Sequence, residues 1–403
     1  MGPAFVTSLE EVAAIRARCV VEAPAAPRPA AHAVTRLQLT RFRSYERLDL
    51  GVDARPVVLV GANGAGKTNI LEALSWLQPG RGLRGATLAD AERRAPSPAP
   101  LAQGWAVAAQ ATGPDGAVRL GSGLDAATGR RAVRIDGEVA GPMALSRHMR
   151  LAWLTPAMDR LFLEGPGGRR EFLDRLTIAL EPDHAVRLAA YEKAMRERRA
   201  LLETGAPDGD WLAAAEARMA QDGVAVTLAR LRTVAALDGA SRDRAFPHGF
   251  PSAELCLVGG LEARLAQEDP SEVEGEFRSR LAASRARDAA AGRTLEGPHR
   301  SDLRVTHAEK AMPAGEASTG EQKALLVGLV LAFARLGRTM PVMLLDEAAA
   351  HLDPQRRRAL CEAILALGMQ AWLTGTDAAL FSAFEGRAQL FTVEDGALAP
   401  RAA

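Results

Sequence analysis

The stretch GANGAGKTN at residues 61–69 matches the phosphate-binding pattern G-x-x-x-x-G-K-[ST]. It follows the apolar run PVVLV at residues 56–60, which is typical of a buried strand, and it precedes ILEAL at residues 70–74, which favours a helix. This order of strand, loop and helix is the context that the pattern requires. The sequence therefore predicts a loop that binds a nucleoside triphosphate.

Each residue type in this loop has a chemical reason. Glycines allow positive φ and bring backbone N–H groups close to phosphate oxygens, while the helix start adds partial positive charge. Lys67 is expected to reach the β- and γ-phosphates, and the Thr68 hydroxyl is expected to ligate Mg²⁺. The chain has only four lysines, and a compact ammonium fits such a loop better than a guanidinium does. The predicted nucleotide-binding residues are Gly61, Ala62, Asn63, Gly64, Ala65, Gly66, Lys67 and Thr68.

A second motif is the apolar run VMLL at residues 342–345, which ends in Asp346 and Glu347. Beside a phosphate loop, Asp346 is predicted to hold the Mg²⁺ shell together with Thr68, and Glu347 is predicted to polarise the attacking water. Two carboxylates after a strand are also common at the start of a solvated loop. The phosphate loop elsewhere in the chain favours the catalytic interpretation.

A third motif is STGEQK at residues 318–323, which opens a long apolar helix. A serine hydroxyl and a glycine N–H at a helix start form an anion site, and the segment resembles the signature motif of ABC-type ATPases at Ser318, Gly320 and Gln322. The alternative is an ordinary N-cap at Ser318, with Glu321 completing a capping box. The position of the segment shortly before the strand that ends at Asp346 favours the signature motif.

This resemblance implies an assembly. In ABC-type ATPases the signature motif contacts the γ-phosphate held by another subunit, so a single copy implies a head-to-tail homodimer with two ATP molecules at its interface. Asp353 resembles the D-loop residue that crosses such an interface. Residues 372–377 stand where many of these ATPases have a switch histidine, and they contain none. Thr374 or Thr376 would substitute for it, and hydrolysis would be slow.

Composition sets the broad class. The chain has 403 residues, of which 48% are apolar, which predicts a globular protein with more than one core. Three isolated cysteines indicate a reducing compartment, and no apolar run is long enough to cross a bilayer, so we expect a cytoplasmic protein without membrane contact. The formal net charge is only +1, so any DNA-binding site has to be a local patch.

The pattern of elements predicts an α/β fold, namely an ABC-type P-loop ATPase head with a mixed sheet, an antiparallel β layer at about residues 104–135, and an inserted, mostly helical lobe. Residues 1–33 are expected to be a disordered extension. The head is assigned to residues 34–167 and 292–403, and the lobe to residues 168–291. Helices are expected in the lobe at residues 169–180, 183–203, 210–238 and 271–291. Later strands at residues 302–306, 342–345, 371–373 and 389–393 are expected to join the parallel sheet of the head.

Over residues 34–396 the chain resembles the RecF family of bacterial DNA replication and repair proteins. Beyond the ATPase motifs, the resemblance depends on short segments with the sequences FRSY at residues 42–45, GRGLR at 80–84, GPGGRREFLD at 165–174 and GRT through GPHRSDL at 292–303. It implies an ATP-dependent DNA-binding clamp, with weak ATPase activity used as a switch, that acts in DNA damage repair. DNA with single-strand gaps and duplex junctions, RecR and RecO are the implied partners, and RecA is an indirect one.

Two questions stay open at this stage. The alternative function is an ABC-type ATPase subunit of another machine, for transport or chromosome structure. His299 and Arg300 form either a buried structural hinge or part of a site.

Since DNA affinity comes largely from neutralised phosphates, the candidate phosphate contacts are Arg81, Arg84, Arg93, Arg94, Arg130, Arg131 and Arg134.

Overall fold

The computed structural model describes residues 30–93, 104–204, 209–243, 249–350 and 352–401. These residues divide into two compact units. The helical unit comprises residues 160–242 and 253–317, and the sheet unit comprises residues 30–159, 243–252 and 318–401 within the described ranges. Each unit therefore combines segments that are far apart in the sequence.

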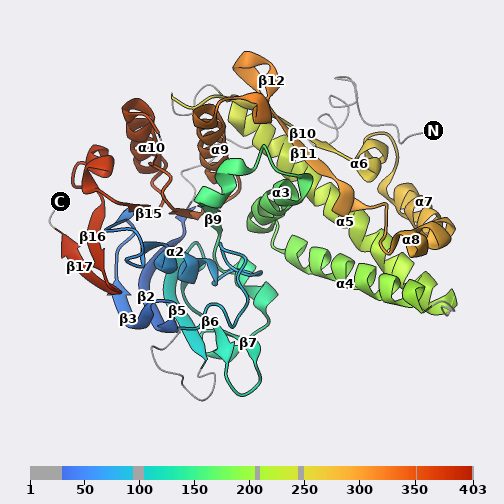
Figure 1. Cartoon of the computed structure of the whole chain (residues 1–403), viewed down its shortest axis with the longest axis horizontal. Coiled ribbons are helices and arrows are strands. Elements are labelled where there is room, and N and C mark those ends of the chain that lie inside the picture. Colours follow the sequence, from blue (N-terminus) through green and yellow to red (C-terminus); the bar gives the residue numbers. More distant parts are fainter. Residues whose placement is uncertain (1–29, 94–103, 205–208, 244–248, 351, 402–403) are drawn as a thin grey trace. The chain divides into compact units, whose positions relative to one another are not determined.

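A mixed six-stranded sheet forms the centre of the sheet unit (Figure 1). All neighbouring strands are parallel except β16 and β17, which are antiparallel. The central strands consist almost wholly of apolar residues that are buried on both faces, as expected for a parallel sheet. The strand order is β17 (Ala397–Arg401), β16 (Gln389–Glu394), β4 (Val57–Val60), β15 (Ala371–Gly375), β14 (Val342–Leu345) and β9 (Leu151–Leu154).

A second six-stranded sheet in this unit is wholly antiparallel. It confirms the predicted antiparallel layer, because the strands expected within residues 104–135 pair with one another and with the strand that starts before residue 34. Buried and exposed residues alternate along β2 and β5, as in a sheet with one face on a core. The order is β3 (Tyr45–Gly51), β2 (Ala33–Phe42), β5 (Trp105–Gly113), β6 (Gly116–Asp125), β7 (Arg130–Ile135) and β8 (Glu138–Val139).

The helix α2 (Lys67–Ser75) contacts strands of both six-stranded sheets. Its residues Ile70, Leu71 and Leu74 are fully buried in one apolar cluster with residues of β2, β4 and β5. The long helices α9 (Thr319–Ala334) and α10 (Pro354–Leu367) also belong to this unit. The first turn of α2 is therefore fixed by a core that lies on both of its sides.

The prediction that residues 1–33 form a disordered extension is wrong for the last residues of that range. Ala30 and Ala31 form β1, which pairs in parallel with β13 (Thr339–Met340). His32 is buried, and its backbone N–H donates to the carbonyl of Met340 at 3.1 Å. Burial lowers the pKa of His32 to about 4, so the imidazole is neutral at pH 7. Residues 1–29 of the predicted extension lie outside the described residues.

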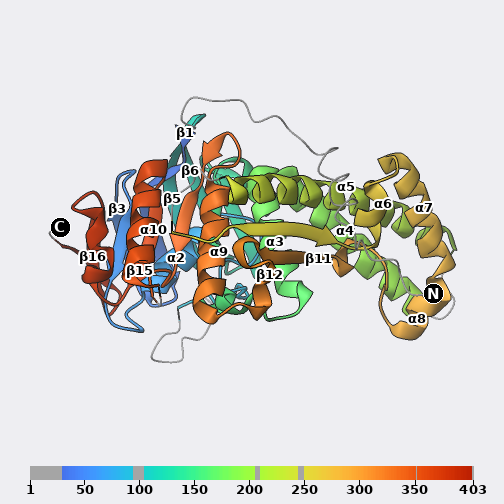
Figure 2. The ribbon, with the colours of Figure 1, turned by 90° about the horizontal axis from the view of Figure 1, so that it is seen from above.

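The helical unit contains six α-helices among its described residues (Figure 2). The longest, α5, contacts α4, α7 and the strand β10. The helices are α3 (Pro166–Leu180), α4 (Asp183–Glu203), α5 (Gly209–Arg242), α6 (Gly260–Leu265), α7 (Pro270–Ala283) and α8 (Arg285–Ala291). A three-stranded antiparallel sheet has the order β10 (Ala253–Val258), β11 (Asp302–His307) and β12 (Met312–Pro313). In the two units together, the 3₁₀ turns among the described residues are Pro142–Arg147, Pro156–Arg160, Pro298–Arg300, Ala308–Lys310, Ala314–Glu316 and Ala378–Phe384.

Two sequence expectations fail in this unit. The strand expected at residues 302–306 does not join the parallel sheet, because β11 pairs antiparallel with β10 along its whole length. The helix expected over residues 271–291 is broken at Ser284, whose hydroxyl donates to Asp288 Oδ2 at 2.8 Å. A serine that bonds locally in this way favours a helix end over a helix interior.

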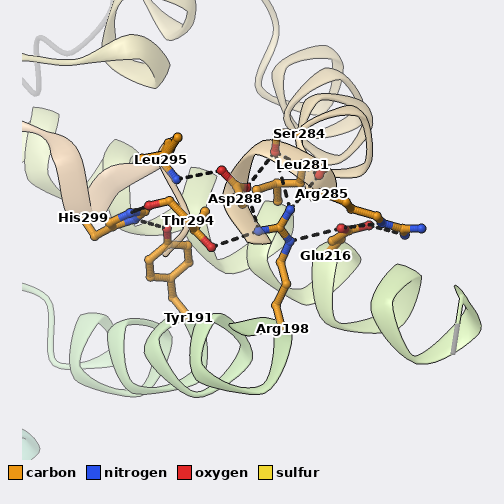
Figure 3. Close-up of polar contacts among 10 residues, drawn as sticks. All are labelled: Tyr191, Arg198, Glu216, Leu281, Ser284, Arg285, Asp288, Thr294, Leu295 and His299. Carbon is orange, nitrogen blue, oxygen red and sulfur yellow. Dashed lines mark hydrogen bonds and ion pairs between the residues drawn. The ribbon is translucent and has the colours of Figure 1, made fainter. Parts of the chain in front are cut away.

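A buried polar network connects the helices of this unit (Figure 3). Arg198 of α4 is fully buried and donates to Glu216 Oε1 of α5 at 3.1 Å and to Asp288 Oδ2 of α8 at 2.8 Å. Its remaining donors reach Thr294 Oγ1 at 3.0 Å and the carbonyl of Leu281 at 2.7 Å. One guanidinium thus holds four segments of the chain, and its charge is compensated by two buried carboxylates.

The same network includes His299. For this residue the sequence left two interpretations open, a buried structural hinge or part of a site. Its Nδ1 lies 2.7 Å from the hydroxyl of Tyr191, and its Nε2 lies 2.9 Å from the carbonyl of Thr294. Burial lowers the pKa of His299, so a neutral imidazole that donates from Nε2 fits both contacts. His299 therefore helps to hold the turn at residues 297–301 in place.

Within the described part of the chain, no helix is both long and apolar enough to cross a membrane.

Candidate nucleotide-binding site

The phosphate loop connects β4 to α2, as the sequence predicts. Gly66 precedes the helix with φ of 108°, and a side chain there would approach Ser44 Oγ at 2.8 Å. At the other end of the loop, the N–H of Gly61 donates to the carbonyl of Gly375 at 3.3 Å, and a Cβ at Gly61 would lie 2.2 Å from the carbonyl oxygen of Val393. Both ends of the loop therefore require glycine, whereas Ala62, Asn63 and Gly64 between them are exposed.

Lys67 lies across the inside of this loop. Its ammonium donates to the carbonyl of Gly61 at 2.6 Å and to the carbonyl of Ala62 at 2.7 Å, and the residue is only 5% exposed. Burial lowers the pKa of Lys67, while the negative charges of Glu347 and Asp346 act in the opposite direction. The loop thus contains a desolvated cation with two carboxylates nearby, which is the electrostatic setting for a polyphosphate and a metal ion.

Asp346 lies at the carboxyl end of β14 and connects the two halves of the site. Its Oδ1 accepts hydrogen bonds from the hydroxyl of Thr68 at 2.9 Å and from the hydroxyl of Thr374 at 2.8 Å. Its backbone N–H donates to the carbonyl of Leu154 on β9 at 2.9 Å. Because β4, β15, β14 and β9 are parallel neighbours, their carboxyl ends meet at one edge of the sheet, where α/β proteins bind ligands.

Glu347 follows in a conformation that its neighbours enforce. Its φ of 50° is in the left-handed region, which costs energy for any residue with a Cβ. Its N–H donates to Thr374 Oγ1 at 2.9 Å. Among the described residues, its carboxylate has no hydrogen-bond partner. The backbone is therefore fixed, while the side chain is available for a ligand or a water molecule.

Thr374 and Thr376 differ in their surroundings. Thr374 is 1% exposed and contacts both acidic residues, whereas Thr376 is exposed. Thr374 Oγ1 donates its single proton to Asp346 and accepts from the N–H of Glu347. The side chain that positions the acidic pair is therefore Thr374, at the place where the sequence lacks a histidine.

Thr374→Val is expected to destabilise the protein by about 1–3 kcal/mol, because it leaves a buried N–H and a buried carboxylate each without one partner. Thr374→Ser keeps the hydroxyl and removes only a methyl group, so it should cost about 1 kcal/mol or less. Urea denaturation followed by circular dichroism measures both variants. A loss in the valine variant that is no larger than the loss in the serine variant would show that the hydroxyl of Thr374 contributes no more to stability than its methyl group does.

Lys323 is a site residue that the sequence only weakly indicated, through the scarcity of lysine. It lies on α9 and is 7% exposed. Its ammonium is 3.3 Å from Asp159 Oδ2 and 3.4 Å from the carbonyl oxygen of Glu347. Lys323 therefore ties the helix that begins with the third motif to the backbone of the second motif.

The third motif lies at the start of α9, where Ser318 is the N-cap. The carboxylate of Glu321 accepts from the N–H of Ser318 at 3.1 Å, which is a contact of a capping box. It also accepts from the hydroxyl of Ser318 at 2.9 Å. Ser318 is exposed and Gly320 is half-buried, whereas Gln322 is only 3% exposed. Ser318 and Gly320 are thus open to a second molecule, but the Gln322 side chain faces the interior. No hydrogen bond between described residues joins Ser318 to the phosphate loop.

Asp353 is the N-cap of α10. Its carboxylate accepts from the N–H of Arg356 at 2.9 Å, and this hydrogen bond holds the pKa of Asp353 below its usual range. The side chain is exposed. A structural role as a helix cap is therefore satisfied within the chain, and the exposure leaves room for an additional contact.

The predicted phosphate contacts separate into two groups. Arg131 supports the protein itself: it donates to the carbonyls of Trp76 at 2.6 Å and Gln78 at 2.8 Å, and burial lowers its pKa to about 10. Arg84 pairs with Glu72 at 3.0 Å, and Arg93 pairs with Glu46 at 2.9 Å. The arginines of the set that are exposed and have no ion pair among the described residues are Arg81, Arg130 and Arg134. Arg94 lies outside the described residues.

A polar network behind α2 was missed as a unit, although the FRSY segment contains part of it. Glu72 of α2 is fully buried and pairs with Arg43 at 2.5 Å as well as with Arg84. Asn69 donates to Ser44 Oγ at 2.9 Å and accepts from Arg84 at 2.9 Å. This network fixes the first two turns of α2 just beyond the phosphate loop.

Comparisons with known proteins agree on one family. The family model described as RecF/RecN/SMC N terminal domain matches residues 33–398. The chain is 51% identical over 382 residues to the DNA replication and repair protein RecF of Caulobacter vibrioides, and the match covers 92% of this chain and 98% of that protein. It is 50% identical over 380 residues to the protein of the same name from Mesorhizobium japonicum, with 92% and 99% covered.

A solved structure of the recombination mediator protein RecF-ATPrS in the RecFOR pathway is similar in fold. Its TM-score is 0.78 at 18% identity, and the match covers 93% of this chain and all of that chain. At this identity the similarity shows the fold alone, and it confirms the predicted ATPase head with an inserted lobe.

Proposed function

Since the chain belongs to the RecF family of DNA replication and repair proteins, we propose that it is an ATP-dependent DNA-binding clamp with slow ATPase activity. The observation that carries the proposal is the hydrogen-bonded group of Thr68, Asp346 and Thr374 next to the buried ammonium of Lys67. This group combines a phosphate-binding loop with an acidic pair on the edge of one sheet, which is what binding and hydrolysis of ATP require.

ATP binding uses the loop and its lysine. The exposed loop residues 62–64 would offer backbone N–H groups to the phosphates. The Lys67 ammonium, which donates to the carbonyls of Gly61 and Ala62, would pair with β- and γ-phosphate oxygens. Thr68 in the first turn of α2 and Asp346 directly after β14 offer oxygen ligands. Together with the phosphates they would suit Mg²⁺, which is commonly bound through one or two carboxylates. The metal ion supplies positive charge that neutralises the phosphates during bond cleavage.

Hydrolysis depends on Glu347, whose carboxylate is free to orient and polarise a water molecule beside the γ-phosphate. Thr374 holds the backbone of Glu347 and the side chain of Asp346 at once. The hydroxyl of Thr374 donates its only proton to Asp346. Unlike an imidazole, a hydroxyl does not gain or lose a proton at neutral pH. A slow reaction follows, and slow turnover suits a switch that stays closed while DNA is bound.

Closure requires a second copy of the chain. Ser318 and Gly320 are accessible at the N-terminus of α9, where the helix dipole favours a negative ligand. In a head-to-tail homodimer the N-terminus of α9 in each copy contacts the γ-phosphate of the ATP that the other copy binds. Two ATP molecules then lie in the interface. Asp353, exposed at the start of α10, approaches the same interface.

The proposed targets are duplex DNA and the junctions of single-strand gaps, bound through local arginines such as Arg81, Arg130 and Arg134. RecR and RecO are the proposed protein partners, and loading of RecA at gaps in the cytoplasm is the proposed outcome. Fluorescence anisotropy of labelled duplex and gapped DNA, with and without ATP, tests this directly. If ATP changes neither DNA affinity nor subunit association, the clamp proposal fails.

Ser318→Asp separates the signature role from the cap role. Aspartate is as good an N-cap as serine, but it loses the hydroxyl donor to Glu321, so circular dichroism has to show that the helix content is unchanged. The new carboxylate would repel the triphosphate of a second copy. We expect ATP-dependent association to weaken by about tenfold or more, because like charges across an interface cost several kcal/mol. ATP binding to the single chain should stay within about twofold, since Ser318 does not contact the loop. Light scattering and nucleotide titration measure the two quantities.

Ser318→Thr is the matched control, since it keeps the hydroxyl and the cap. It should associate like the unchanged protein. Association that is equally strong in the aspartate variant would leave Ser318 with the role of a helix cap only.

A further inference from the structure

A polar cavity of about 410 Å³ lies between α10 and the 3₁₀ turn Ala378–Phe384, which is labelled η6 below. We call it the α10–η6 cavity. Both walls belong to the sheet unit. The residues that line it are Pro354, Arg357, Arg358, Glu362, Ala379, Leu380, Ser382, Ala383, Glu385 and Arg387.

Three arginines, Arg357, Arg358 and Arg387, bring positive charge to the lining of the cavity. Arg357 is half-buried, and neither it nor Arg358 has a side-chain hydrogen bond or ion pair among the described residues. Arg387 donates to the carbonyl of Phe384 at 3.2 Å and is 3.6 Å from Glu385. A half-buried guanidinium without an acceptor is uncommon, because its five N–H donors have lost part of their water. Arg357 is therefore the group that an added ligand would satisfy.

The walls of the cavity are fixed. Asp353 caps α10, and Asp377 caps η6 by accepting from the N–H of Ala379 at 2.9 Å. The ring of Phe381 packs so closely on Gly375 that a Cβ there would lie 2.6 Å from it. The arginines are thus presented by two rigid segments that need no rearrangement before binding, which lowers the cost of ordering a partner.

The charge pattern selects the kind of ligand. Guanidinium groups pair best with carboxylates and phosphates. Glu362 and Glu385 also line the cavity, and they would repel the closely spaced phosphates of a nucleic acid backbone. Pockets for small molecules are mostly apolar, whereas this one is lined chiefly by charged and polar groups. A ligand that fits this cavity should be polar and should carry one negative charge without others close to it. An aspartate or glutamate side chain flanked by uncharged residues of a peptide has these properties.

We propose that the α10–η6 cavity docks an acidic segment of a partner protein, with an aspartate or glutamate side chain of that segment paired with Arg357. The proposal goes beyond the ATP-dependent clamp, since docking needs neither nucleotide nor DNA. The position of the cavity adds a consequence. α10 begins directly after Asp353, and η6 begins four residues after Thr374, so the docked segment would contact the two elements that continue from the loops of the nucleotide site.

The test is fluorescence anisotropy of a labelled peptide that carries one glutamate in an otherwise uncharged sequence, with the full chain and without nucleotide. Arg357→Glu is expected to weaken peptide binding by about tenfold or more, because it replaces an attraction by a repulsion in a partly buried site. Glu362→Gln should strengthen binding by about twofold, because it removes a like charge at the rim. The opposite signs of the two effects identify this cavity as the binding site.

Arg119→Glu is the matched control, since Arg119 is exposed on β6 in the same unit and the change in charge is identical. It should leave peptide binding within about twofold, as expected for a distant surface charge. Equal loss in the Arg119 and Arg357 variants, or no binding of the peptide, overturns the proposal. A labelled single-stranded oligonucleotide completes the test: if Arg357→Glu weakens its binding as much as that of the peptide, the cavity is a nucleic acid site and the proposal is wrong.

Discussion

Lys67→Ala is expected to weaken ATP binding by about 100-fold or more, because hydrogen bonds to charged groups contribute about 1.5–3 kcal/mol each and Lys67 is proposed to make two of them. Its ammonium already lies within the loop, 2.6 Å and 2.7 Å from two loop carbonyls. Lys323 does not replace it, since its ammonium is engaged by Asp159 and by the backbone of Glu347. Titration with a fluorescent ATP analogue measures the change.

Lys193→Ala is the control, since Lys193 is one of the other lysines and is largely exposed, 3.8 Å from Glu197 on the surface of α4. It should not change ATP affinity. The free energy of unfolding of the Lys67 variant should also stay close to that of the unchanged protein, because the loss of the two hydrogen bonds is offset by removal of a desolvated charge. If the two variants bind ATP equally well, the phosphate loop does not bind nucleotide.

Arg198→Ala is expected to lower the free energy of unfolding by about 3–5 kcal/mol, the usual cost of removing one member of a buried ion pair. Glu216 keeps Arg285 as a partner at 2.6 Å, but Asp288 loses its arginine and retains only hydroxyl and backbone donors. An uncompensated carboxylate in the interior of the helical unit is the physical cause. Urea denaturation followed by circular dichroism, which is dominated by helices, measures the loss.

The adjacent Arg199 provides a matched control on the same helix. Its side chain is 60% exposed and pairs with Glu203 at 2.8 Å, so Arg199→Ala should cost about 0.5 kcal/mol or less. Arg198→Lys should lie between the two, since an ammonium keeps the charge but cannot reach all of the acceptors of a guanidinium. Similar losses at positions 198 and 199 would mean that the buried network contributes nothing beyond an ordinary surface pair.

The fold around the phosphate loop could be predicted because its signals are local. The pattern of residues 61–68 fixes a strand before it and a helix after it, and β4 and α2 confirm both. The apolar run before Asp346 predicts a buried strand, and parallel strands bring their carboxyl ends together. The hydrogen bond between Thr68 and Asp346 follows from those two facts, although the residues are far apart in the sequence.

Strand partners and arginine roles could not be predicted in the same way. The alternation of residues 302–306 indicates a strand, but it does not say that β10 is its neighbour, and β10 itself is a short apolar run inside a helical region. Arg131 has the same chemistry as Arg130 and Arg134. Its structural role follows from contacts with the segment after α2, namely the carbonyls of Trp76 and Gln78 and the ring of Trp76 at 5.0 Å from its guanidinium. Such choices depend on contacts between distant segments.

The edges of the antiparallel sheet affect how copies of the chain meet at high concentration. At one edge, β8 has only two residues. At the other, β3 exposes Glu46, Arg47 and Asp49 along its length. Short or charged edge strands resist the addition of a foreign strand, which is the first step of amyloid-like aggregation. Both edges of this sheet are therefore poor templates for a strand of another copy, which lowers the tendency of the chain to polymerise through it.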